Sequence, residues 1–211
     1  MKNVIRCSAV SFNAIPVSTE ERDNWSVVLE YEDQGSGPYV VDLSHRPRWD
    51  LQDAEIGGIQ TLGIPIPNIP GQCVFEKGFL VNRMNRTQAS VWHLSGALPV
   101  FPDDPALTDV TDATVFLAIF GQDLFAILEK LSALDFLDPV HQTPFLLQGP
   151  FCHVPCQIVT LDKTPARSGV LMTCSRGYGR DMVGAILAAG AEFNLRPAGE
   201  RAFSEWLAAI R

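Results

Sequence analysis

Two segments of the chain share the pattern Gly-x-Asp followed by an apolar run. They are GQDLFAIL from Gly121 and GRDMVGAIL from Gly179, and apolar residues recur at helical spacing in both. The strand-like runs ATVFLAIF and GVLMTCS precede them, and FCHVPCQIVTL supplies another strand between the two segments. The order is therefore strand, helix, strand, strand, helix, short strand, which is the split βαβ arrangement of a ferredoxin-like α+β domain.

An aspartate lies near the start of each of these two helices. Asp123 and Asp181 are expected to stabilise the positive ends of the helix dipoles, as capping residues do. A phosphate-binding loop would need more glycines than these segments contain. The repeat instead supports a pseudo-symmetric pair of βαβ halves.

The first half of the chain is richer in strand and turn signals. Residues 25–50 hold two β-rich runs around a Gly/Pro turn cluster, which predicts a hairpin, with a further strand at 49–52. A second hairpin is predicted for Phe79 to Met84 and Ala89 to Leu94. Between the hairpins, the prolines of IGGIQTLGIPIPNIPGQ exclude a helix interior and a central strand, so we expect an ordered loop.

Residues 99–112, PVFPDDPALTDVTD, form a Pro/Asp-rich connector and mark the best internal boundary. They divide the chain into a β-rich subdomain at 1–98 and a ferredoxin-like subdomain with a C-terminal helix at 113–211. A chain of 211 residues is long enough for two such subdomains packed as one unit.

Composition narrows the classes of partner. With 46% hydrophobic and 19% charged residues, the chain reads as a folded globular protein. A net charge of −8 disfavours nucleic acid and anionic membrane surfaces. We expect no secretory signal and no membrane-spanning segment, and five cysteines without such a signal predict reduced thiols in the cytoplasm.

The segment AAGAEFNLRPAGERAF, residues 188–203, concentrates turn-forming residues near the end of the chain. We interpret it as a junction rather than a catalytic motif. Pro197 is expected to stop a strand and start the last helix, and Gly199 to allow a close approach of backbone segments.

Several of these phrases, in the same order, resemble the glycine-cleavage T-proteins (aminomethyltransferases) and the shorter gamma subunits of heterotetrameric sarcosine oxidases. AGAEFNLRPAGERAF, VVDLSHRPRWDL and LAIFGQDLFAILEKLSALDF resemble the T-protein segments. LGIPIPN and the EFNL phrase resemble the gamma subunits. The resemblance implies an α+β fold of two interlocked ferredoxin-like subdomains, of the aminomethyltransferase folate-binding type.

The chain departs from the T-protein pattern where that family carries its reactive carboxylate. The family has a Gly-Gly-x-x-Asp-Asp turn, whereas FEKGFLVNRM keeps Gly78 but has no Asp pair, and Glu76 lies on the other side of the glycine. No catalytic residue or metal ligand is therefore assigned. The resemblance implies a non-catalytic subunit in folate-linked amine oxidation and one-carbon metabolism, packed against a larger flavoprotein subunit.

The alternative is a stand-alone tetrahydrofolate-binding, aminomethyltransferase-like enzyme that uses another acid, with Glu76 or Asp42 tested first. Tetrahydrofolate is the cofactor implied, and no covalently bound cofactor is expected. The candidate cofactor-binding residues are Arg46, Arg83 and Glu76. The arginines Arg46 and Arg83, with Arg48 and Arg86, could make bidentate contacts to a folate glutamate tail, but solvated arginines are also common at hairpin ends.

Other candidate residues keep more than one interpretation. His45 in DLSHRP is either a base or a hairpin-end histidine, since no nucleophile is recognisable beside it. CHVPC places Cys152 and Cys156 together, either as a metal or redox site or as buried thiols. If the segment is a strand, these two cysteines share one face and His153 points away.

Overall fold

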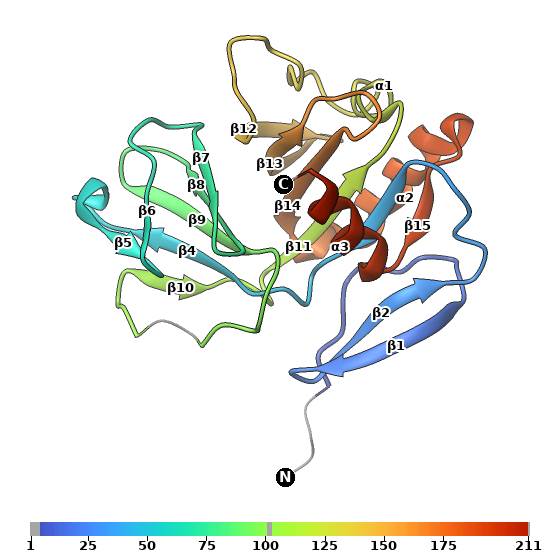
Figure 1. Ribbon diagram of the computed structural model, residues 1–211, viewed down its shortest axis with the longest axis horizontal. Helices are drawn as coiled ribbons and strands as arrows, with labels where there is room; N and C mark the ends of the chain where they lie inside the picture. Colours follow the sequence, from blue (N-terminus) through green and yellow to red (C-terminus); the bar gives the residue numbers. More distant parts are fainter. Residues whose placement is uncertain (1–4, 101–102, 211) are drawn as a thin grey trace.

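The computed structural model describes residues 5–100 and 103–210. Two principal β-sheets lie side by side in this part of the chain, with a separate hairpin and the last helix beside the second sheet (Figure 1). The first sheet has five strands in the order β10-β4-β9-β8-β7, and all neighbours are antiparallel. Its strands are β4 (Arg48–Gln52), β7 (Cys73–Glu76), β8 (Phe79–Arg83), β9 (Gln88–His93) and β10 (Leu107–Asp109).

The second sheet has six strands in the order β12-β13-β14-β11-β3-β15. Its strands are β3 (Tyr39–Asp42), β11 (Thr114–Phe120), β12 (Phe145–Phe151), β13 (Val154–Asp162), β14 (Gly169–Ser175) and β15 (Arg196–Ala198). β15 pairs with β3 in parallel, whereas the other neighbours are antiparallel. Two further two-stranded sheets pair β1 (Pro16–Arg22) with β2 (Trp25–Tyr31) and β5 (Gln60–Thr61) with β6 (Ile64–Pro65).

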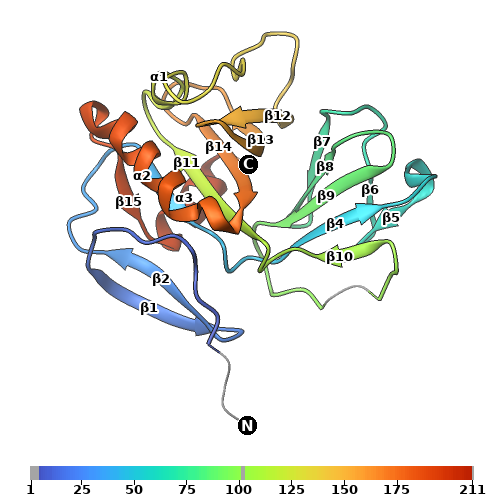
Figure 2. The ribbon, with the colours of Figure 1, turned by 180° about the vertical axis from the view of Figure 1, so that it is seen from behind.

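Helices cover both faces of the second sheet. The helices are α1 (Leu124–Leu128), α2 (Gly179–Gly190) and α3 (Glu200–Ala209), with short 3₁₀ turns at Ile56–Gly58, Arg176–Tyr178 and Ala191–Phe193. α1 and α2 pack on one face, and α3 packs on the other together with residues of the first sheet (Figures 1 and 2). None of the helices in the described ranges has the length and apolar character that a membrane crossing requires.

β11 shows why a continuous apolar run becomes a strand with both faces covered. Val115, Leu117 and Ile119 belong to the core cluster under α1 and α2. Phe116 and Phe120 belong to the cluster shared with α3 and the first sheet. Because successive side chains of a strand point to opposite faces, a buried central strand needs apolar residues at every position. The predicted buried strand and the mixed α+β class are confirmed.

The hairpin predicted within residues 25–50 is wrong. β2 pairs with β1, and β3 pairs instead with β11 and β15. The turn cluster between β2 and β3 therefore carries the chain from a peripheral hairpin into the second sheet. The second predicted hairpin is confirmed, because β8 and β9 pair with Phe79 opposite His93.

Three predictions for the second half need correction. The sequence predicts a loop leading to the strand FCHVPCQIVTL, but residues 145–151 form β12, whose Gln-Gly-Pro interior hides the strand pattern. Cys152 and His153 have positive φ angles of 51° and 65° and form the turn between β12 and β13, so they are not part of a strand. Pro197 lies inside β15 rather than ending it, which the edge position of β15 allows because no partner needs its missing N–H.

In addition, short strands β5 and β6 interrupt the loop predicted around the prolines.

The chain passes between the two sheets twice. Residues 43–47 lead from β3 in the second sheet to β4 in the first, and residues 110–113 lead from β10 back to β11. Strand pairing thus crosses the sequence boundary at 99–112 in both directions. The division of the chain into subdomains at that connector stays a prediction.

Arg48 holds these two connections together. Its side chain is fully buried, and its Nη1 group donates to the carbonyls of Arg46 (2.6 Å) and Ser44 (3.3 Å) in the first connection. Its Nη2 group donates to the carbonyls of Thr111 (2.7 Å) and Thr114 (2.9 Å) at the second, and Nε donates to Thr114 Oγ1 (3.1 Å). Every nitrogen of the guanidinium therefore has a partner.

Gly199 lets α3 begin directly against the β1–β2 hairpin. A Cβ atom at this position would lie 2.1 Å from the carbonyl carbon and oxygen of Leu29 and 2.4 Å from the amide nitrogen of Glu30. The Gly199 N–H also donates to Gln34 Oε1 at 2.8 Å. The predicted close approach of backbone segments at Gly199 is confirmed.

We expect Arg48→Met to lower the free energy of unfolding by about 3 kcal/mol or more, because buried carbonyl groups lose charge-assisted partners. Urea unfolding at neutral pH measures the loss. The control is Arg180→Met on exposed helix surface, for which we expect a change within about 0.5 kcal/mol. A loss below about 1 kcal/mol for Arg48→Met would show that the two connections do not depend on this side chain.

We expect Gly199→Ala to destabilise the protein by about 1–3 kcal/mol, since the new methyl group overlaps backbone atoms that cannot rotate away. Gly184→Ala is the matched comparison, because Gly184 lies within α2 and its Cβ would meet nothing within 4 Å. That variant should gain about 0.5–1 kcal/mol from helix propensity. Opposite signs in thermal unfolding are the expected result, and a neutral Gly199→Ala would contradict the close approach.

Candidate functional site

A buried carboxylate at the start of α3 collects three basic side chains. Glu200 is 3% exposed, and its Oε1 atom accepts from His45 Nε2 at 2.9 Å and from Arg46 Nη2 at 2.5 Å. Its Oε2 atom pairs with Arg22 Nη1 at 2.5 Å. We call Glu200, His45, Arg46 and Arg22 the Glu200 network.

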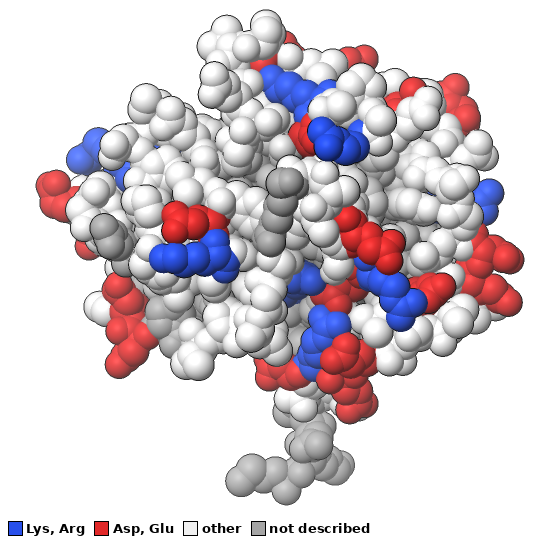
Figure 3. Space-filling view, viewed as in Figure 1, with Lys and Arg blue, Asp and Glu red and all other residues white. Residues whose placement is uncertain are grey.

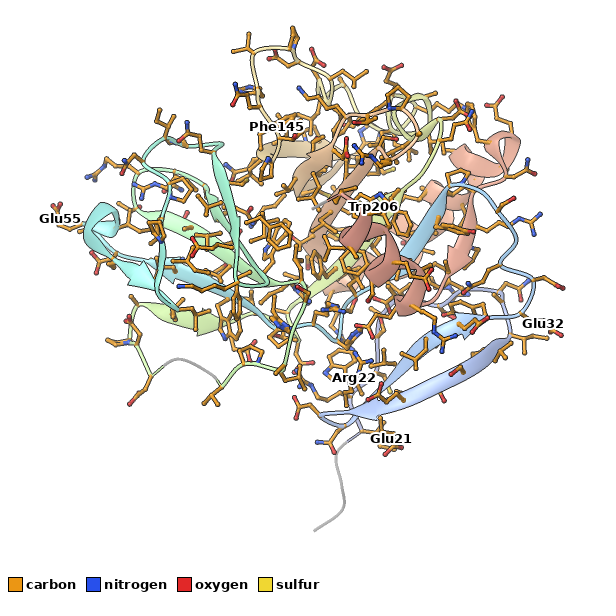
Figure 4. The ribbon with its side chains drawn as sticks, in the orientation of Figure 1. Glu21, Arg22, Glu32, Glu55, Phe145 and Trp206 are labelled. Carbon is orange, nitrogen blue, oxygen red and sulfur yellow. The ribbon has the colours of Figure 1, made fainter. Side chains whose placement is uncertain are left out.

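The members of the Glu200 network come from three distant parts of the chain. Arg22 ends β1, and Figure 4 shows it on the hairpin below α3. His45 and Arg46 lie on the connection between β3 and β4. Arg46 also donates through Nη1 to the carbonyl of Leu94, which follows β9. The network therefore ties α3 to the hairpin, to the inter-sheet connection and to the first sheet.

The surroundings fix the charges of this network. Burial alone would raise the pKa of Glu200, but the hydrogen bond from His45 and the charges of Arg46 and Arg22 lower that pKa to about 2. The helix N-terminus favours the same negative charge. Burial lowers the pKa of His45 even though Glu200 opposes that shift, so the imidazole is neutral at pH 7. Because an ionised carboxylate only accepts, the Nε2 atom of His45 carries the proton and Nδ1 keeps its lone pair.

A neighbouring histidine is buried beside the network. His93, at the end of β9, is 2% exposed and packs against Phe79 with ring centroids 5.1 Å apart. Burial and then the charge of Arg46 lower the pKa of His93 to about 4. His93 is therefore neutral at pH 7, and the positive charges that face Glu200 come from its two arginines.

This arrangement can hold a neutral imidazole in a fixed orientation, as a proton acceptor requires. The cavities beside His45 are small, with volumes of about 40 Å³ and about 150 Å³. They have room for water or a very small molecule. Glu200 itself is a poor proton donor or acceptor near neutral pH, because its pKa lies far below that range.

The structure does not bring the three predicted cofactor-binding residues together. Arg46 lies in the Glu200 network, whereas Glu76 ends β7 with its side chain 47% exposed and 3.6 Å from Lys77 Nζ. Arg83 is at the far end of β8, about 13 Å along the strand from Phe79, the residue paired with Glu76. One end of the first sheet thus carries the acid and the other end carries the arginine.

Arg46, Arg48 and Arg83 are all buried, so for them the interpretation as solvated hairpin-end arginines is wrong. Arg83 donates through Nη2 to the carbonyl of Arg86 at 2.6 Å. Its Nε and Nη1 atoms are buried and have no hydrogen-bond partner in the described part of the chain. Asp42, the other acid considered, accepts from the Ser44 amide at 2.9 Å.

The cysteines do not share the strand face that the sequence predicts. The turn at 152–153 separates Cys152 from β13, and the direct cross-strand neighbour of Cys156 is Cys174. The hydrogen bond between these two thiols lowers the pKa of Cys174 and raises that of Cys156. Over residues 5–100 and 103–210, no group of three or more His, Cys, Asp or Glu side chains is placed to hold a metal ion.

Sequence reasoning missed Glu200 and Arg22, two members of the Glu200 network. The local signal of Glu200 is an acid directly after Gly199, which acts as the N-cap of α3. Nothing local reveals its partner His45, which lies 155 residues away in sequence.

Comparison with known proteins finds similar structures but no similar sequence. No protein-family profile matches the chain, and no curated protein matches its sequence. A chain of the heterotetrameric sarcosine oxidase from Corynebacterium sp. U-96, determined in complex with pyrrole 2-carboxylate, matches with a TM-score of 0.60 and 12% identity. The match covers 73% of this chain and 84% of that one.

The second structural relative is the glycine cleavage system aminomethyltransferase T from Bartonella henselae. It matches with a TM-score of 0.59 and 13% identity, over 88% of this chain and 56% of the aminomethyltransferase. This chain thus spans little more than half of that protein. Both likenesses confirm the predicted resemblance at the level of the fold.

We expect Glu200→Gln to cost about 3 kcal/mol of unfolding free energy at pH 7, because the buried Arg46 and the partly exposed Arg22 lose their counter-charge. The folded-state pKa lies below the unfolded one, so the carboxylate stabilises the fold above about pH 4.5 and loses this effect as the pH falls toward 2. The difference between wild type and variant should therefore shrink over that interval, as measured by urea unfolding.

The control for this experiment is Glu205→Gln, an exposed position on the same helix. It should change the unfolding free energy by less than about 0.5 kcal/mol, both at pH 7 and near pH 2. A gap between wild type and Glu200→Gln that stays constant down to pH 2 would contradict an ionised, paired Glu200.

Proposed function

We propose that this chain is a non-catalytic, aminomethyltransferase-like subunit of a larger amine-oxidising flavoprotein assembly in folate-linked one-carbon metabolism. The observation that carries the proposal is the pattern of structural coverage. The chain matches most of one chain from a heterotetrameric sarcosine oxidase but only about half of an aminomethyltransferase. A protein of this size and fold is suited to act as one component beside a larger subunit.

The charged residues support a non-catalytic role. Glu76 is solvated next to Lys77, and Glu200 is held ionised by its basic partners. Arg46 has both of its terminal nitrogens engaged by Glu200 and the Leu94 carbonyl. Glu200 does not exchange protons near neutral pH, and Arg46 cannot bind a second carboxylate without breaking an existing pair.

In this proposal the chain helps to enclose a compartment for tetrahydrofolate that the larger subunit completes. The predicted folate contacts do not form one site within this chain. The two α+β halves would be interlocked ferredoxin-like subdomains, supported by the order of β11, α1, β13, β14, α2 and β15 along the chain. We place the assembly in the cytoplasm, in keeping with the free cysteines among the described residues.

A stand-alone tetrahydrofolate-binding enzyme remains the alternative function, and one observation favours it. The buried Nε and Nη1 atoms of Arg83 have no protein partner in the described part of the chain, and a carboxylate such as a folate glutamate tail would satisfy them. Binding of tetrahydrofolate to the isolated chain, lost in Arg83→Met, would support this alternative.

The first test is affinity purification of the tagged chain from its native organism. We expect a larger subunit in stoichiometric amount and a flavin absorption spectrum in the eluate. An unrelated acidic protein with the same tag, purified in parallel, controls for adventitious capture. Recovery of this chain alone and colourless would overturn the proposal, and titration with tetrahydrofolate would then test the alternative.

A further inference from the structure

A groove with a volume of about 850 Å³ lies at the end of the second sheet, beside α3. It is built where the starts of β3 and α3, the end of β11 and the turn after α2 meet. Figure 4 shows Trp206, one of its lining residues, on α3 near the centre of the molecule. The Glu200 network uses the first residue of α3, and this groove uses the residues that follow.

Three aromatic side chains give the groove a fixed apolar wall. Phe120 and Trp206 are stacked with ring centroids 4.8 Å apart, and Tyr39 lies 5.7 Å from Phe120. Trp206 is 9% exposed and is anchored by its Nε1 donor to the carbonyl of Arg167 at 2.9 Å. These rings are held in place before any ligand binds, so contact with the apolar body of a ligand requires little ordering of the groove side chains.

The charged side chains of the groove leave an excess of negative charge. Arg201 is paired with Glu30 at 2.5 Å, which neutralises both. Asp123 and Glu205 are exposed and make no ion pair within the described residues. Figure 3 shows acidic side chains, with basic ones among them, over the β1–β2 hairpin and α3. The groove therefore presents two uncompensated carboxylates beside aromatic rings.

The backbone at Asp123 is unusual in a way that concerns the same groove. Asp123 precedes α1 in the left-handed conformation, with φ of 61°, and its side chain makes no capping hydrogen bond to the helix. Asp123 is thus the N-cap residue of α1, as predicted, but its carboxylate makes no capping hydrogen bond and remains available to a ligand. A non-glycine residue held in this conformation costs energy, and such residues concentrate at binding sites.

We propose that this groove binds an organic cation: an ammonium group carried on an apolar body. The carboxylates of Asp123 and Glu205 attract the ammonium group, and the rings of Tyr39, Phe120 and Trp206 contact the apolar part. An anionic ligand is disfavoured, because the groove's arginine is already paired with Glu30. The proposal does not depend on a partner subunit or on folate.

The test titrates the isolated full-length chain with benzyltrimethylammonium at low ionic strength, by calorimetry and by ligand-observed NMR. Phenylacetate and benzyl alcohol are the anionic and neutral comparison ligands of similar size. We expect saturable binding of the cation, weaker at high salt, and no saturable binding of the two comparison ligands. Asp123→Asn and Glu205→Gln should each weaken the affinity for the cation about fivefold.

The control variant is Glu129→Gln, which removes an exposed carboxylate outside the groove and should leave the affinity unchanged. Thermal unfolding checks that each exposed substitution leaves the fold intact. The proposal is overturned by no saturation up to about 10 mM cation, by equal binding of phenylacetate, or by an affinity that the two groove variants do not change. Failure here leaves the purification result untouched, because no partner subunit takes part in this titration.

Discussion

The buried guanidinium of Arg48 is the interaction on which the arrangement of the two sheets depends. Burial lowers its pKa to about 9, so it stays charged at neutral pH while fully removed from water. A buried charge is tolerated only where partners surround it, and here they are backbone and threonine oxygens from both connections between the sheets. Arginine suits this position because its planar fork supplies several fixed donors, which a lysine would not reproduce.

The same connection sets the position of the Glu200 network. Arg48 fixes the carbonyls of Ser44 and Arg46, and the side chains of His45 and Arg46 from this short segment meet Glu200. The close approach at Gly199 then brings α3 against the hairpin that carries Arg22. One chain crossing therefore orients the start of α3, and α3 in turn orients the residues that line the large groove.

The sequence predicts those features whose causes are local. The continuous apolar run makes the strand 114–120 recognisable, and the lack of a side chain at Gly199 marks a close approach. The burial of Arg48 was not predictable, because its carbonyl partners Thr111 and Thr114 are 63 and 66 residues away. The Glu200 network is hidden for the same reason, and β12 is hidden because a glycine and a proline interrupt its pattern.

The pKa of Glu200 limits the chemistry that this carboxylate can perform. A carboxylate with a pKa of about 2 is ionised throughout the physiological range, so it orients and neutralises cations but does not exchange protons with a substrate. Forming the network thus converts charged residues near the junction of the two sheets into structural contacts. Among the described residues, the neutral His45 and the groove carboxylates of Asp123 and Glu205, which pair with no arginine, can still act on a ligand. Since α3 connects both, a partner or ligand that displaced this helix would change the two sites together.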